Sequence, residues 1–294
     1  MNKAASPMPY VAIIAAIAVY SMMDTTMKFA ALAVGAYNAT LWRSILGFVM
    51  VLPLWLHEGA RWPDRALLKL HLMRGCVMAG VATGFFYGVV RMPLAEAVAI
   101  TFIAPLIALA LAALLLGEKI GRHAIIASVL GLIGVAVIAL GQQDRDHAHP
   151  EVVLGVVAVL VSACLYAWNL VLQRQQALLA KPAEVAVFQS GVASLVLLAA
   201  GPWLFVMPKA GDWLSIGSSA ALAVAALMLA SWAYARAEAQ ALVPFEYTAF
   251  LWAALLGWLA FGEKLTVPTM IGAMLIVLGC WIAAPRKHIE QTAL

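Results

Sequence analysis

Two stretches of the chain, LLLGEKI at residues 114–120 and LAFGEKL at residues 259–265, nearly repeat one another. They lie 145 residues apart, and at the same offset Gly134 matches Gly279. Each stretch ends one long apolar run, and a second apolar run follows after a short gap. A period close to half the chain length indicates an internal duplication.

The composition is that of a membrane protein. Of 294 residues, 65% are hydrophobic and 11% are charged, whereas about 25% are charged in ordinary soluble domains. One soluble core of this size cannot bury so much apolar surface, so the expected partner is the lipid bilayer. The net charge of +4 is explained by basic residues in the loops and gives no reason to expect nucleic acid.

Ten apolar runs are long enough to cross about 30 Å of hydrocarbon, which takes roughly 20 helical residues. Strands would leave backbone groups unpaired in lipid, and no barrel-type alternation is visible, so we expect helices. The predicted spans are residues 9–31, 37–56, 68–90, 94–116, 123–140, 152–172, 184–206, 214–235, 241–261 and 267–284.

Lysine and arginine are distributed unevenly between the two sides of the membrane. Eleven fall on the side of the N-terminus and four on the other, or five with Lys28, which predicts cytoplasmic termini. Each half, residues 1–145 and 146–294, contains five spans. Because five is odd, the second half must enter the membrane from the opposite face. The predicted fold is therefore an all-α integral membrane protein of two inverted five-helix repeats, typical of alternating-access transporters.

The same residues carry a family resemblance. Gly-Glu-Lys closes the fourth span of each half, at residues 117–119 and 262–264, and the first of these spans begins with Ala-Glu-Ala at 95–97 and contains Pro105. In these features the chain resembles EamA-type ten-helix members of the drug/metabolite transporter superfamily, most of all the amino-acid exporters of the YddG type. The resemblance implies one transport domain that exports amino acids or similar small metabolites across a bacterial inner membrane. The second half departs from the pattern, because Phe250 stands where the first half has Pro105.

Some small-residue features are predicted to be structural. The glycine of each motif, at 117–119 and 262–264, should end a helix, and the lysine should lie in the headgroup layer. Gly80, Gly84 and Gly88 recur every four residues in the third span. Such a stripe favours close approach of another helix over the lining of a ligand site.

Ionisable side chains inside the spans are the first candidates for function, because burying them in a bilayer costs several kcal/mol. Asp24 and Lys28 lie four residues apart and so share a helix face. They either neutralise one another, with Lys28 reaching toward water, or leave Asp24 to bind a substrate amine or a proton. Arg43, in the second span, either reaches the headgroups or binds a substrate carboxylate.

Two glutamates begin later spans. Glu246 lies two residues after Pro244, and a proline there removes a backbone donor and can expose carbonyl groups to a cavity. The alternative is an interfacial carboxylate that reaches cytoplasmic water. Glu96 is interpreted as a first-turn carboxylate favoured by the helix dipole.

One asparagine and three aromatic residues complete the set of candidate functional residues. Asn169 is costly in lipid and follows Trp168 directly. Tyr87 and Tyr234 occupy corresponding places in the third and eighth spans. In inverted halves this puts one tyrosine near each face, where gates are expected, although both could simply pack helices together.

These observations predict a central cavity between the first, third, fourth, sixth, eighth and ninth spans. Carboxylates and the amide would bind a substrate ammonium group, Arg43 or helix N-termini its carboxylate, and aromatic rings its variable part. The candidate substrate-binding residues are Asp24, Tyr87, Trp168, Asn169, Tyr234 and Glu246.

Several absences narrow the function further. The sequence has no phosphate-binding loop, and its three cysteines lie singly within spans, so we expect no ATP-driven pumping, no metal and no other cofactor. The competing hypothesis is a membrane enzyme acting on a lipid or isoprenoid, which would require clustered Asp or His residues. Facilitated diffusion is favoured over proton coupling, because Glu246 is the only isolated carboxylate. The oligomeric state is not predicted.

Overall fold

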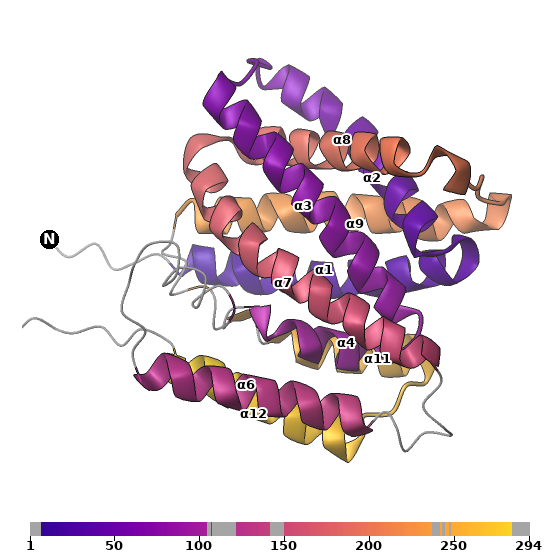
Figure 1. The fold of residues 1–294 in the computed structure, drawn as a ribbon. Coiled ribbons are helices and arrows are strands. Elements are labelled where there is room, and N and C mark those ends of the chain that lie inside the picture. The colour runs from indigo at the N-terminus through magenta and orange to yellow at the C-terminus, as the bar shows by residue number, and fades with distance from the viewer. Residues whose placement is uncertain are drawn as a thin grey trace, which may run out of the picture.

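The computed structural model describes residues 7–104, 107, 122–141, 150–236, 242, 245–246 and 248–283, and this part of the chain is built from helices (Figure 1). They match the ten predicted spans one to one. Residues 117–119, Pro105 and Pro244 lie outside the described residues. The α-helices are α1 (Met8–Val34), α2 (Ala36–His57), α3 (Arg65–Val89), α4 (Leu94–Thr101), α6 (Arg122–Gly141), α7 (Pro150–Leu179), α8 (Pro182–Ala200), α9 (Trp213–Tyr234), α11 (Thr248–Phe261) and α12 (Val267–Ala283).

Three predicted boundaries are wrong by six residues or more. The sixth span, expected to end at residue 172, continues as α7 to Leu179, and α4, expected to continue to residue 116, ends at Thr101. The seventh span, expected to reach residue 206, ends at Ala200, because Gly201 and Pro202 follow and proline cannot continue a helix by donating a backbone hydrogen bond. Two short 3₁₀ turns, η1 (Pro202–Leu204) and η2 (Ala210–Asp212), then lead into α9.

The chain is a multi-pass, all-α integral membrane protein. Six of its described helices (α1, α2, α3, α7, α8 and α9) are long and apolar enough to cross a membrane, and α11 and α12 are shorter apolar helices. We call the membrane face where α1 begins the N-terminal face and the other the opposite face. The short helix α4 is buried along nearly its whole length, from Leu94 to Ile100, in the largest hydrophobic core of the molecule.

Helix packing has the symmetry expected of two related halves. α2 packs on its counterpart α8, α4 on α11, and α6 on α12. The contact of α1 with α9 is matched by that of α7 with α3, which is the same contact with the halves exchanged. Figure 1 shows α6 and α12 lying side by side at one edge of the bundle.

The paired helices run in opposite directions, as inverted halves require. On α6, Gly134 lies against Gly272 and Ile276 of α12, whereas Gly141 lies against the earlier residue Pro268. A Cβ added to Gly134 would lie 2.6 Å from the carbonyl oxygen of Gly272, so only glycine allows this crossing.

The glycine stripe of α3 forms a similar crossing. Gly80 faces Leu165, Gly84 faces Ala158 and Ser162, and Gly88 faces Gly155 and Val159 of α7. The prediction of a helix-packing face is confirmed, and the descending order of partners shows that α3 and α7 are antiparallel. The two crossings hold the first half against the second.

Candidate functional site

A cavity of ≈ 270 Å³ lies at the centre of the bundle. Its wall includes residues from α1, α3, α4, α7, α9 and α11, the six helices expected from the sequence, and also from α2 and α8. The two added helices bring Thr40, Arg43 and Ser44 from α2 and Gln189 and Ser190 from α8. The wall is mainly apolar, and its charged side chains are Asp24, Arg43, Arg74 and Glu246.

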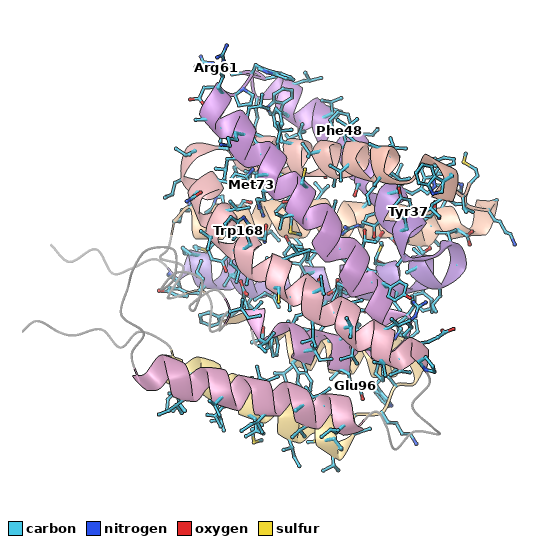
Figure 2. The ribbon with its side chains drawn as sticks, in the orientation of Figure 1. Tyr37, Phe48, Arg61, Met73, Glu96 and Trp168 are labelled. Atoms are coloured by element: carbon cyan, nitrogen blue, oxygen red, sulfur yellow. The ribbon has the colours of Figure 1, made fainter. Side chains whose placement is uncertain are left out.

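Four of the six candidate residues line this cavity: Asp24, Asn169, Tyr234 and Glu246. Trp168 does not. It is 36% exposed and lies on α7 (labelled in Figure 2), because consecutive residues of a helix point about 100° apart and Asn169 takes the inward direction. Tyr87 is also absent from the cavity wall; the Arg91 guanidinium lies 3.6 Å from its ring centroid.

Glu246 and Tyr234 meet at the end of the cavity nearer the N-terminal face. The Tyr234 hydroxyl donates a hydrogen bond to Glu246 Oε1 at 2.5 Å. Tyr20 and Tyr166 line the same cavity, so Glu246 faces a surface of tyrosines. Of the two tyrosines predicted to lie near the gates, Tyr234 lines the cavity and Tyr87 does not.

Asp24 and Arg43 occupy the half of the cavity nearer the opposite face. Both line the cavity wall, so of the two alternatives for Arg43 the one in which it reaches the headgroups is wrong. Its guanidinium contacts Met23 Sδ at 3.5 Å and lies 5.7 Å from the Phe86 ring centroid. The Arg43 Nε atom is buried and has no hydrogen-bond partner among the described residues, so it can donate to a molecule in the cavity.

Of the two alternatives for Asp24 and Lys28, mutual neutralisation is also wrong. Lys28 forms a buried ion pair with Glu263, the glutamate of the second Gly-Glu-Lys motif, and donates to the carbonyl oxygen of Met92 at 3.0 Å. Glu263 accepts in addition from the backbone N–H of Leu94 at 2.8 Å. We call these four residues the Lys28 cluster. The carboxylate of Glu263 therefore bonds within the protein, and Gly262 ends α11 as predicted, with φ +66°.

Glu96 has the first-turn position expected of it, at the start of α4. Its side chain is buried, and the Thr269 hydroxyl of α12 donates to its Oε1 at 3.0 Å. Glu96 is labelled in Figure 2, near α4 and α12. This contact joins the two halves outside the cavity.

A second polar cluster was missed in the sequence. Arg74, 2% exposed, donates to Asn169 Oδ1 at 2.9 Å and to Gln176 Oε1. Gln176 Nε2 lies 2.5 Å from His71 Nδ1, and His71 Nε2 lies 3.2 Å from Glu184 Oε1. We call these five residues the Arg74 chain; it runs from the cavity wall to the N-terminal face.

Spacing along the helices could have revealed the Arg74 chain. His71 and Arg74 are three residues apart on α3, and Asn169, Gln173 and Gln176 recur at spacings of four and three on α7. Each set therefore shares one helix face. Polar stripes on two apolar helices indicate that the helices face one another, because each polar group needs a partner in a membrane.

Comparison with known proteins places this geometry in a family. The model of the EamA-like transporter family matches residues 7–140 and 153–284. A riboflavin transporter of Brucella anthropi is 23% identical over 90% of this chain and 94% of its own length. A pseudopaline exporter of Pseudomonas aeruginosa is 24% identical over 89% and 90%. One crystal structure shares the fold, with a TM-score of 0.61 at 21% identity, over 94% of this chain and 96% of that one.

Proposed function

Because the chain belongs to the EamA-like transporter family and is therefore a membrane transporter of small molecules and not an enzyme, we propose that it exports amino acids or similar small metabolites. The family membership removes the alternative of a lipid-modifying enzyme. In this proposal residues 1–145 and 146–294 form one transport domain in a bacterial inner membrane. The two inverted halves would rock against one another and open the central cavity to each side in turn.

The observation that carries the substrate class is the presence of both signs of charge in one cavity wall. Asp24 and Glu246 are acidic, and Arg43 and Arg74 are basic. A zwitterion that leaves water must find partners for its ammonium and carboxylate groups, because an unpaired buried charge is very costly. In the proposal Glu246 or Asp24 binds the ammonium group, and an arginine binds the carboxylate.

The size and lining of the cavity favour a small substrate with an apolar part. The volume of ≈ 270 Å³ lies just below the range of about 300–1,000 Å³ that is usual for small-molecule sites. Phe85, Phe86 and Phe102 contribute apolar surface. A molecule with the size of an aromatic or branched amino acid suits such a site better than one as large as riboflavin.

The direction of transport and its energetics are part of the same proposal. The excess of basic residues on the N-terminal side supports cytoplasmic termini, and export is the direction that the resemblance to amino-acid exporters implies. Facilitated diffusion remains the proposed mode. Because Asp24 is not neutralised by Lys28, however, Asp24 and Glu246 are both candidate proton carriers if transport is coupled.

The test is transport by proteoliposomes that contain only the purified protein, with a panel of radiolabelled amino acids. We expect uptake of apolar or aromatic amino acids down their gradient, and a loss of at least about tenfold in Glu246→Gln, the effect of about 1.4 kcal/mol in binding. Glu151→Gln, at a side chain that is 78% exposed, is the matched control. Transport of none of the panel would contradict the substrate class, and accumulation driven by a pH gradient would contradict facilitated diffusion.

A further inference from the structure

The Arg74 chain joins the cavity to the N-terminal face without a break. Arg74 and Asn169 line the cavity, whereas the side chain of Glu184, at the other end, is 17% exposed. Building on the proposed function, we propose that binding of a substrate carboxylate at Arg74 is linked, through Gln176, to uptake of one proton by His71.

The donors and acceptors of the chain have only one consistent arrangement. A guanidinium can only donate, so Gln176 turns its Oε1 toward Arg74. Its NH₂ group therefore donates to His71 Nδ1 at 2.5 Å. Nδ1 carries no proton, and the Nε2–H group of a neutral ring donates to Glu184 at 3.2 Å.

A second proton on His71 conflicts with this arrangement. A proton on Nδ1 would point at the NH₂ group of Gln176. If the Gln176 amide rotated to accept it, the NH₂ group would then point at Arg74, which also only donates. While Arg74 is bound to Gln176, one junction of a protonated chain must lack a hydrogen bond, and a buried polar group left unpaired destabilises that state.

A carboxylate in the cavity relieves the conflict. Arg74 lines the cavity and can turn its guanidinium toward the carboxylate, because charge-assisted bonds to carboxylates are stronger than bonds to a neutral amide. Gln176 is then free to rotate and to accept from Nδ1–H. The proton comes from the buffered solution at the N-terminal face, where a buffer acid loses it. It forms an N–H bond on the His71 ring and gives an imidazolium beside the Glu184 carboxylate; no bond of the substrate changes.

The surroundings of His71 support a proton site at this position. Among the described residues, the charged groups that act on its ring are Glu184 on α8 and Arg74 on its own helix, and α7 presents the neutral Gln176. Phe188 of α8 stacks on the ring, with centroids 4.5 Å apart and planes inclined by 15°. The ring is therefore fixed in position, and the orientation of the Gln176 amide is the variable that can change.

The first test needs no substrate. Nuclear magnetic resonance of protein with ¹⁵N-labelled histidine reports the protonation of His71, whose signal is assigned by its loss in His71→Asn. At a fixed pH, Arg74→Met and Gln176→Glu should each raise the ratio of protonated to neutral His71 by about tenfold, the effect of about 1.4 kcal/mol. Gln176→Glu keeps the chain filled, but its carboxylate accepts from both neighbours. The exposed His57 should be unchanged, and equal titration of His71 in all three proteins would overturn the inference.

The second test uses L-phenylalanine and phenethylamine, which lacks the carboxylate. Calorimetry in two buffers of different ionisation enthalpy counts the protons taken up on binding. Binding of L-phenylalanine should be accompanied by uptake of as much as one proton by the protein. Its affinity should therefore fall by up to about tenfold per unit rise in pH. Binding of phenethylamine to the wild type, or of L-phenylalanine to Gln176→Glu, should be accompanied by no proton uptake. Binding of L-phenylalanine to the wild type without proton uptake would overturn the linkage. Failure of L-phenylalanine to bind would count against the proposed substrate; the titration of His71 would then decide whether Arg74 and His71 are linked.

Discussion

The Lys28 cluster and the Arg74 chain are both buried, both polar and both built around one basic side chain, yet they are organised differently. In the Lys28 cluster, Lys28 and Glu263 bind one another and the backbone of residues 92 and 94, so its partners come from the protein itself. The Arg74 chain begins in the cavity wall and extends through His71 to Glu184 near the N-terminal face; the side chains of Glu184 and Glu263 are exposed to a similar degree. The first arrangement holds helix ends together, and the second can respond to what enters the cavity.

The largest expected effect comes from breaking the Lys28 cluster. Lys28→Met leaves the largely buried Glu263 carboxylate with the Leu94 N–H group as its only remaining hydrogen-bond partner among the described residues, and removing one partner of a buried ion pair costs about 3–5 kcal/mol. Thermal unfolding of the purified protein in detergent should show a large fall in midpoint. Lys69→Met, at an exposed lysine of α3, should leave the midpoint unchanged. A double variant, Lys28→Met with Glu263→Gln, should recover much of the loss; no recovery would mean that Lys28 acts through packing and not through its charge.

The Arg74 chain should be somewhat less sensitive to interruption. Gln176→Leu leaves Arg74 and His71 each without one hydrogen bond, which costs about 3 kcal/mol for two buried groups, one of them charged. Gln175, the preceding residue, is exposed, so Gln175→Leu is the matched control. If both leucine variants unfold at the wild-type temperature, the Arg74 chain does not contribute to stability.

The crossing of α3 and α7, the helices that carry four of the five residues of the Arg74 chain, offers a third test. A Cβ added to Gly88 would lie 2.9 Å from the carbonyl oxygen of Gly155 on α7, so Gly88→Ala should cost about 2 kcal/mol by overpacking. At Gly217, on α9, the added Cβ has no atom within 4 Å beyond its chain neighbours and the backbone of its own helix. Gly217→Ala should therefore be neutral or slightly stabilising, because alanine favours a helix. Equal unfolding midpoints for the two variants would show that α3 and α7 can separate at no cost.

The smallest effect is expected at Trp168, directly beside the Arg74 chain. Its side chain is 36% exposed and does not line the cavity, so Trp168→Leu should change the transport rate in proteoliposomes less than about twofold, within about 0.5 kcal/mol for a surface position. Asn169→Leu, one residue along, removes the partner of Arg74 and should lower the rate much more. A larger loss at Trp168 would return it to the candidate site.

The fold could be predicted because hydropathy and span count are local properties of the sequence. Ten apolar runs, five in each half, and one repeated motif were enough to predict the inverted architecture. The site was predicted in part: Asp24, Asn169, Tyr234 and Glu246 line the cavity. Asp24 was considered as a partner of Lys28 because the two are close along the first helix. The contact of Lys28 with Glu263 joins residues far apart in the sequence, so spacing along one helix cannot reveal it. The contacts of Arg74, Gln176 and His71 depend on which helices are neighbours. Apolar composition does not specify this, and the signal for it in the sequence is the pair of polar stripes on the third and sixth spans.

The pairing of helices with their own counterparts has an evolutionary consequence. Because α2 packs on α8, α4 on α11 and α6 on α12, one half-length chain inserted into the membrane in both orientations could make the same contacts as an antiparallel homodimer. Fusion of two such copies would keep these contacts and let the halves diverge. Lys28 would then have been free to specialise in one copy while Gln173 took the matching place in the other. Separately expressed halves of today's chain should still assemble, and failure of the two to co-purify would show that divergence has made the covalent connection essential.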